Sequence, residues 1–397
     1  MDDAASNVEQ GPRCPPWVRR MGPRDPDEVG RSATPLELFF DLSFVVAIAI
    51  AGSHLHHALS ANHVAHGVLS YVMVFFAIWW AWMGLTWFAS AYDPDDLPYR
   101  LKVFIQITGV LVLAAGVPRA FEHHDFSMIV LGYVIMRVGL VALWWRAARS
   151  DPVRRTTALR YIIGLVVLQC CWVGMLWIPK DYQLLVWIVL VPIELAVPAW
   201  AERAAPTTWH PHHISERYGL LALIVMGESI LAITMAMQAA IDSGEVTASF
   251  WTVIAGSLLT VFSMWWLYFG LPAHRHLTSM RMAFVWGYAH SLIFMCIAAV
   301  GSGLAVAVDD AMGKSSLPSY GVGLSIAIPT SVFVVTLAAL FGGRVLGWRA
   351  SGALLALAVL LMLGSTALED APLLIGIILV GLASGISMLA RRKAAAS

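Results

Sequence analysis

Charged side chains are scarce in this sequence. Asp, Glu, Lys and Arg make up 13% of its 397 residues, about half the share found in soluble globular domains. So little charge cannot cover a surface that faces water, which excludes a soluble protein. The formal net charge is +0 at pH 7, which excludes nucleic-acid binding through a basic surface. Hydrophobic residues reach 59%, so the composition predicts a polytopic integral membrane protein.

Cysteine is also scarce, and the common catalytic motifs are missing. The four cysteines, two of them adjacent at Cys170 and Cys171, do not form a disulfide framework. The sequence has no Gly-rich phosphate loop, Gly-x-Ser-x-Gly, His-Glu-x-x-His or Cys-x-x-Cys motif. It therefore predicts no cofactor and favours a protein that is not an enzyme. Without a soluble domain to bind ATP, active transport would have to use an ion gradient.

Twelve apolar stretches follow a polar, proline-bearing tail at residues 1–33, which we expect to be flexible. Backbone groups in hydrocarbon must be bonded within their own segment, and these runs are too long for barrel strands, so we expect helices. The predicted spans are 35–58, 63–91, 97–117, 126–147, 156–179, 182–201, 213–241, 247–271, 281–308, 318–341, 350–368 and 371–390. The predicted fold class is all-α, with about twelve transmembrane helices.

Basic residues indicate the orientation of these spans. With the amino terminus in the cytoplasm, nearly all Lys and Arg residues fall in the tails and inner loops. The outer loops hold only Arg119, Lys180 and Lys314. This bias follows the positive-inside rule for an even number of crossings. The sequence therefore predicts that both termini are cytoplasmic.

The chain also shows an internal similarity. Phe75–Leu85 and Val261–Leu271 are identical at five of eleven positions, including a tryptophan pair and a glycine. The two segments lie six spans apart, which predicts two parallel six-helix repeats, 34–205 and 206–397. The alternative is a chance match between aromatic-rich spans. The tryptophans of both segments are candidates to line a cavity, namely Trp79, Trp80, Trp265 and Trp266.

Two carboxylates open the first span. Thr34, Pro35 and Glu37 fit a capping box, in which Glu37 has only a structural role. Asp41 lies one turn deeper on the same helix face. An Asp inside hydrocarbon is costly and usually faces a partner or a wet cavity, so both acids are candidates for the cytoplasmic mouth of an ion path.

Three ionisable residues lie at similar depth near the middle of their spans: Glu228, Arg137 and His290. We expect them to form a transmembrane relay for protons or ions. Two other interpretations are open. Arg137 could pair with a carboxylate in a purely architectural role, and His290 could be a hydrogen-bonded interior histidine.

Two further features concern cavities and metals. Glu194 lies between two prolines, Pro192 and Pro198, and a broken helix with an acid can line a cavity. Histidines are dense near the outer end of the first two spans, where His54 and His57 share a helix face. Aromatic-belt and loop positions explain these histidines equally well, so no metal site is assigned.

Two segments resemble signatures of the bacterial low-temperature-requirement protein A family. Thr34–Ile48 (TPLELFFDLSFVVAI) is similar to the first signature, and His213–Ile233 (HISERYGLLALIVMGESILAI) to the second. The residues that the resemblance marks are Glu37, Asp41, Glu216, Arg217 and Glu228. It implies a multi-pass protein of the bacterial cytoplasmic membrane associated with growth in the cold, without implying a substrate.

Two functions remain open. The first is an ion-coupled transporter or a proton or cation channel, with the relay at its centre and Glu216 and Arg217 at the cytoplasmic mouth. The second is a membrane-embedded lipid-modifying enzyme or lipid-binding protein that supports growth at low temperature. Membrane lipids and a small ion or small-molecule substrate are the expected partners, nucleic acid is not, and a homo-oligomer is compatible with the sequence.

Overall fold

The long apolar runs form helices, as their hydrogen-bonding requirement predicts. The computed structural model describes residues 17–244, 247–270, 277–342 and 348–396. The first six helices are α1 (Pro35–Ser60), α2 (Val64–Tyr92), α3 (Leu97–His123), α4 (Ser127–Ser150), α5 (Arg155–Met175) and α6 (Lys180–Glu202). The next six are α7 (Pro211–Ser243), α8 (Ala248–Phe269), α9 (Met280–Ala311), α10 (Ser319–Leu337), α12 (Trp348–Ser365) and α13 (Ala371–Ala396), and the π-helical turn η2 (Ala338–Gly342) follows α10. The described residues thus form twelve α-helices, which confirms the all-α fold class, and eleven of the twelve predicted transmembrane helices qualify as membrane spans.

Eleven of the helices in the described ranges are long and apolar enough to cross a membrane. The remaining one, α12, contributes a shorter apolar stretch, Gly352–Ser365. The architecture is therefore that of a multi-pass helical membrane protein.

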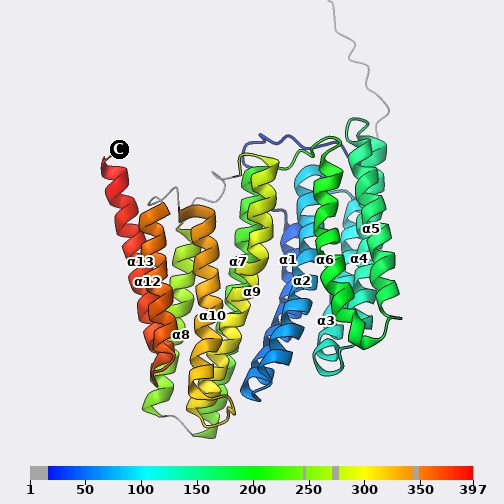
Figure 1. The fold of residues 1–397 in the computed structure, drawn as a ribbon. Coiled ribbons are helices and arrows are strands. Elements are labelled where there is room, and N and C mark those ends of the chain that lie inside the picture. The colour runs from blue at the N-terminus through cyan, green and yellow to red at the C-terminus, as the bar shows by residue number, and fades with distance from the viewer. Residues whose placement is uncertain (1–16, 245–246, 271–276, 343–347, 397) are drawn as a thin grey trace, which may run out of the picture.

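The helices stand side by side in two groups (Figure 1). The group α1–α6 occupies one side, the group α7–α13 the other, and α9 is the most deeply buried of the candidate spans. The described chain begins and ends at the same end of the bundle, at the top of Figure 1. We call this the terminal end, and the opposite one, where α1 finishes at Ser60, the histidine end.

Close packing within the first group depends on glycine. α3 and α4 approach each other so closely that a Cβ on Gly109 would lie 2.6 Å from Gly132 O, and one on Gly132 would lie 2.6 Å from Gly109 O. Only glycine permits this backbone contact. The α3–α4 hairpin thereby forms a rigid wall beside α2.

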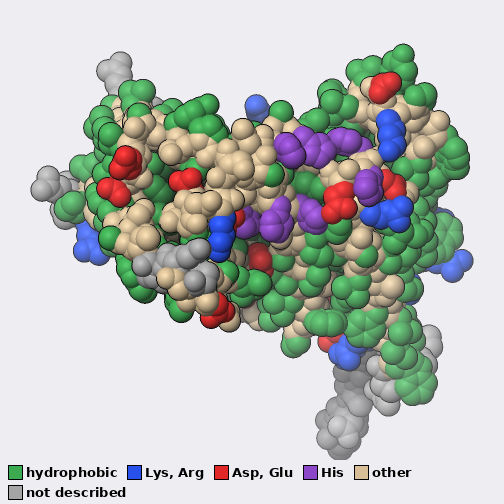
Figure 2. Space-filling view, turned by 90° about the horizontal axis from the view of Figure 1, so that it is seen from below, with side chains coloured by type: hydrophobic (Ala, Val, Ile, Leu, Met, Phe, Trp, Pro, Cys, Tyr) green, Lys and Arg blue, Asp and Glu red, His purple; other side chains and the backbone are tan. Residues whose placement is uncertain are grey.

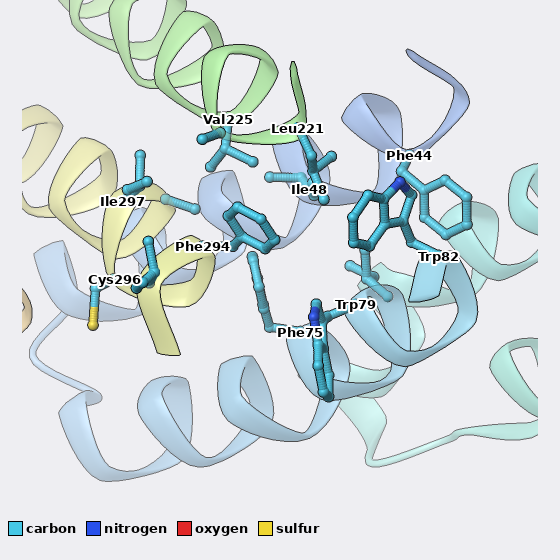
Figure 3. Close-up of a cluster of buried hydrophobic side chains, with 14 of the residues drawn as sticks. Phe44, Ile48, Phe75, Trp79, Trp82, Leu221, Val225, Phe294, Cys296 and Ile297 are labelled. Carbon is cyan, nitrogen blue, oxygen red and sulfur yellow. The ribbon is translucent and has the colours of Figure 1, made fainter. Parts of the chain in front are cut away.

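Apolar side chains fill the junction between the two groups. Figure 3 shows side chains from α1, α2, α7 and α9 packed together, including Phe44, Phe75, Leu221 and Phe294. Phe44 and Phe294 are fully buried in this cluster. A polar path across the protein must therefore lie elsewhere than through this junction.

Candidate functional site

The two signature segments meet at the terminal end, although they are far apart in the sequence. The predicted capping box at the start of α1 is confirmed. The Glu37 carboxylate accepts from Thr34 N at 2.7 Å, and Thr34 Oγ1 accepts from Glu37 N at 3.3 Å. This cap fixes the first turn of α1 and holds Glu37 and Asp41 toward α7.

Asp41 forms a buried ion pair with Arg217 of α7. Arg217 Nε donates to Asp41 Oδ2 at 2.8 Å and Nη2 to Oδ1 at 2.5 Å, with both side chains fully buried. Trp82 Nε1 of α2 also donates to Asp41 Oδ1, at 2.6 Å. A two-point Arg–carboxylate contact is geometrically specific, so it fixes α1, α2 and α7 relative to one another.

Glu37 lies in the same buried cluster. Arg217 Nη1 is 3.2 Å from Glu37 Oε1, His213 Nε2 is 3.1 Å from it, and Arg31 Nη2 is 3.5 Å from it. The two signature carboxylates are thus matched by two arginines and a histidine. Such a network costs several kcal/mol when one partner is removed, because a buried charge is left unpaired.

Residues 17–33, part of the expected tail, are mostly exposed but contact the terminal end of the bundle at a few points. Met21 is fully buried, and Arg24 N donates to Ala91 O at 2.9 Å. Further along, the half-buried Glu216 accepts from Ala33 N at 3.1 Å. The segment therefore covers the signature cluster from the terminal end.

Asp93, just after α2, borders this cluster. Burial, reinforced by the negative charge of Glu37, raises the pKa of Asp93 to about 6. Its Oδ2 atom is buried and has no hydrogen-bond partner among the described residues. A carboxyl in this environment takes up a proton more readily than an exposed one.

A second buried charge site lies deeper, between α4 and α6. Arg137 Nη2 pairs with Glu194 Oε1. Glu194 also accepts from Trp80 Nε1 at 2.8 Å and from Trp172 Nε1 at 2.9 Å. The expectation that Arg137 pairs with a carboxylate is therefore met by Glu194, and the guanidinium additionally lies 5.5 Å from the Tyr133 ring centroid.

A cavity of about 70 Å³ extends from this ion pair toward the terminal end. Its lining includes Arg137 and Glu194 at the deep end and Glu202 and Thr207 near the last turn of α6. Glu202 is buried and accepts from Tyr161 Oη at 2.8 Å and from Thr207 N at 2.7 Å. Most of the lining is apolar, and the cavity is large enough to hold water beside its few polar side chains.

A second cavity, of about 50 Å³, extends from the same place toward the histidine end. It reaches Phe126, at the start of α4, and Met175, at the end of α5. Trp80, Tyr133 and Glu194 line both cavities. The two cavities thus share these three side chains in their walls, with one cavity lying toward the terminal end and the other toward the histidine end.

The other two residues of the expected relay lie apart from this site. Glu228 is half-buried and has no hydrogen-bond partner among the described residues. His290 Nδ1 lies 2.7 Å from Trp286 O and Nε2 lies 3.2 Å from Tyr268 Oη. Across the described ranges, no hydrogen bond joins Arg137, Glu228 and His290, so the structure does not bring the three together.

The tryptophan pairs of the internal similarity differ in environment. Trp79 and Trp80 are 2% and 8% exposed, whereas Trp265 and Trp266 are 49% and 48% exposed. Trp80 lines the two cavities, and Trp79 packs beside it in the core. Trp265 and Trp266 lie on the outer surface of α8.

Histidines gather at the histidine end of the bundle (Figure 2). His56 Nε2 lies 2.6 Å from Asp309 Oδ2 of α9, and the His57 ring stacks on that of His56 at 5.0 Å. The His54 ring packs against Phe121 at 5.3 Å. In the ranges that the structure describes, no three His, Cys, Asp or Glu side chains are grouped to hold a metal ion.

Several residues of both charge sites were missed from the sequence. His213 lies one turn before Arg217, and this helical spacing could have placed both on one face of α7. Trp172, which donates to Glu194, and Arg31, which lies in the expected tail, carry no local signal. Their roles depend on contacts between segments distant in the sequence.

These features define an all-α, multi-pass membrane protein with two buried charge sites. The family model for bacterial low temperature requirement A protein matches residues 32–388, so the chain belongs to this family. It is also 29% identical over 243 residues to an uncharacterised protein of Rhizobium meliloti (strain 1021), a match that covers 59% of this chain. The matched region spans 57% of the length of that relative. The family resemblance of the two signature segments is confirmed.

Proposed function

We propose that this protein moves protons or other small cations across the membrane, as a channel or as an ion-coupled transporter. The path runs between α2, α4, α5, α6 and the first half of α9, with Arg137 and Glu194 at its narrowest point. One observation carries the proposal: two cavities, one lying toward each end of the bundle, share lining side chains around the buried carboxylate of Glu194.

The chemistry of the path favours cations. Glu194 and Glu202 both line the cavity on the terminal side, where Arg137 is the cationic residue of the lining. An ionised carboxylate in hydrocarbon can bind a proton or a cation, and Arg137 competes for Glu194 as an internal counter-ion. A cation entering the cavity would displace Arg137 from Glu194 and open the connection.

We also propose how the protein is oriented in the membrane and that its helices form an internal repeat. The terminal end faces the cytoplasm, since its loops and tails hold most of the basic residues. The helices form two parallel six-helix repeats, 34–205 and 206–397. Matching neighbour pairs support the repeat, because α1 packs on α3 as α7 packs on α9, and α3 on α4 as α9 on α10.

Flux measurements on the purified protein in liposomes test the proposal. With a pH-sensitive dye inside, an imposed proton gradient and separate K⁺ and Na⁺ gradients would be followed for the wild type. Glu194→Gln keeps the side-chain shape and removes the charge, and it should abolish most of the flux. Glu228→Gln, which neutralises another carboxylate in the membrane but outside both cavities, should leave the flux unchanged.

Two results would overturn the proposal. One is a wild-type flux no greater than that of protein-free liposomes for all three cations. The other is equal flux in Glu194→Gln and the wild type. Size-exclusion profiles of both variants show whether a loss of flux reflects a loss of folding.

A further inference from the structure

A third cavity, of about 530 Å³, lies apart from the proposed ion path. It is a groove near the histidine end, between the α1–α2 hairpin and the α9–α10 hairpin. Apolar side chains line it, and the Tyr71 hydroxyl on its wall is already bonded to Met295 O at 2.7 Å. The groove therefore presents a surface that favours hydrocarbon.

Regular helix faces build its walls. On α10 the lining side chains recur about every four residues from Tyr320 to Val332, and on α2 they recur likewise from Val64 to Val72. Ala299 and its neighbours on α9 form the floor. The groove thus follows the helix axes and is continuous with the outward-facing side chains of α2 and α10, such as Val68 and Ile328, which face lipid.

The length of the groove matches one leaflet. Twelve residues separate Tyr320 from Val332, which is about 18 Å at the helical rise per residue. The hydrocarbon of a single leaflet is about 15 Å deep, half of the full core. A groove that starts at the helix ends and has this length can hold an acyl chain that lies along the membrane normal.

One amide side chain and a loop that carries a lysine lie where the groove meets the helix ends. Asn62 lines its mouth. The loop 312–318, which contributes Leu317 and Pro318 to the lining, also carries Lys314. Amide and ammonium groups at this level complement the phosphate of a lipid headgroup.

We propose that this groove binds one acyl chain of a phospholipid from the leaflet at the histidine end, with its phosphate near Asn62 and Lys314. The site joins the two groups of helices, since α1 and α2 belong to one and α9 and α10 to the other. The proposal is independent of the ion path.

Photo-cross-linking of the full-length protein in nanodiscs tests this assignment. The probe is a phosphatidylglycerol with a diazirine midway along one acyl chain, diluted in phosphatidylethanolamine. Adducts are mapped by mass spectrometry after proteolysis. We expect them to concentrate on the peptides around Ala299 and Leu324, above the level on other lipid-facing helices such as α5.

Filling the groove provides the matched comparison. Ala299→Trp should reduce the labelling of α10 to the level of the other helices, whereas Val285→Trp, on the exposed surface of the same helix, should leave it unchanged. Leu324→Trp fills the groove from the opposite wall and serves if Ala299→Trp does not fold.

Three outcomes would overturn the proposal. They are uniform labelling of all lipid-facing helices, labelling that survives both groove-filling variants, and labelling by a diazirine fatty acid but not by the phospholipid. Concentrated labelling that both groove-filling variants remove, with Val285→Trp unaffected, supports it.

Discussion

The single residues that matter most are charges removed from water and paired across helices. Arg217 satisfies Asp41 with two hydrogen bonds in a fully buried setting. The intact pair is more stable than a variant that lacks one partner, because the remaining charge would then be buried without a counter-charge. Among single substitutions, those that remove one charged group of a buried pair are therefore expected to lower the stability most.

Asp41→Asn tests this dependence. The variant leaves Arg217 without a full counter-charge, and we expect a loss of about 3–5 kcal/mol in unfolding free energy. Thermal unfolding in detergent measures the change. Glu216→Gln, next to Arg217 in sequence but only half-buried, is the control and should change stability little. Equal losses in the two variants would contradict the account.

The Arg137–Glu194 pair makes a second prediction about single residues. Arg137→Gln and Glu194→Gln should each destabilise the protein by several kcal/mol, whereas the double variant should lose less than the sum, because no unpaired charge remains. A double-mutant cycle of denaturation free energies gives the coupling. Additive losses would show that the two charges do not depend on each other.

Asp93 makes the stability depend on pH. Its pKa is about 6 in the folded protein, against an ordinary value of 3.8, because burial and Glu37 disfavour the charge. The folded state therefore binds the proton more tightly. Its contribution to stability grows as the pH falls through about 6 and is complete below 3.8; the two pKa values differ by the equivalent of roughly 3 kcal/mol.

The Asp93→Asn variant isolates this effect. It should be more stable than the wild type at pH 7.5, and the difference should shrink at pH 5. Melting temperatures at the two pH values measure it, with Asp27→Asn, at an exposed position, as the control. A wild-type protein that loses as much stability between the two pH values as Asp93→Asn does would contradict the assignment.

At the scale of elements, the features that depend on residues close together in the chain could be predicted from the sequence. Apolar run length predicted the helices, and the capping box at Thr34 predicted the start of α1, because both depend on neighbouring residues. The partner of Arg137 and the packing of residues 17–33 depend on segments far away in the chain. The proline and charge content of residues 17–33 is typical of a flexible segment, so composition predicted a tail. The burial of Met21 depends instead on the helix ends that this segment covers.

Met21→Ala tests the packing of that segment. A fully buried methionine replaced by alanine costs about 2–5 kcal/mol in well-packed sites. We therefore expect a lower melting temperature and faster proteolysis between residues 17 and 33. Trp17→Ala, at a position that is 61% exposed, should do neither. Equal melting temperatures and equal proteolysis in the two variants would contradict the packing of Met21 and indicate a flexible tail.

At the scale of the whole molecule, the two groups of helices are joined by apolar side chains (Figure 3) and, at the terminal end, by the buried Asp41–Arg217 pair. The junction holds the groups together, and the proposed path lies beside it, between helices of the first group and the first half of α9. The two tryptophan pairs of the internal similarity differ in environment, since Trp80 is buried and Trp266 is exposed.

The most direct measurement compares cation flux through liposomes for a blocked path and an unblocked one. Ala81 lines the cavity on the terminal side, and Ala81→Phe should close it while leaving Glu194 and Arg137 in place. Leu131→Phe adds a ring at a 46% exposed position on α4 that faces lipid. The account predicts that Ala81→Phe abolishes most of the flux and Leu131→Phe retains it. Equal flux in the two folded variants would contradict a path through this site.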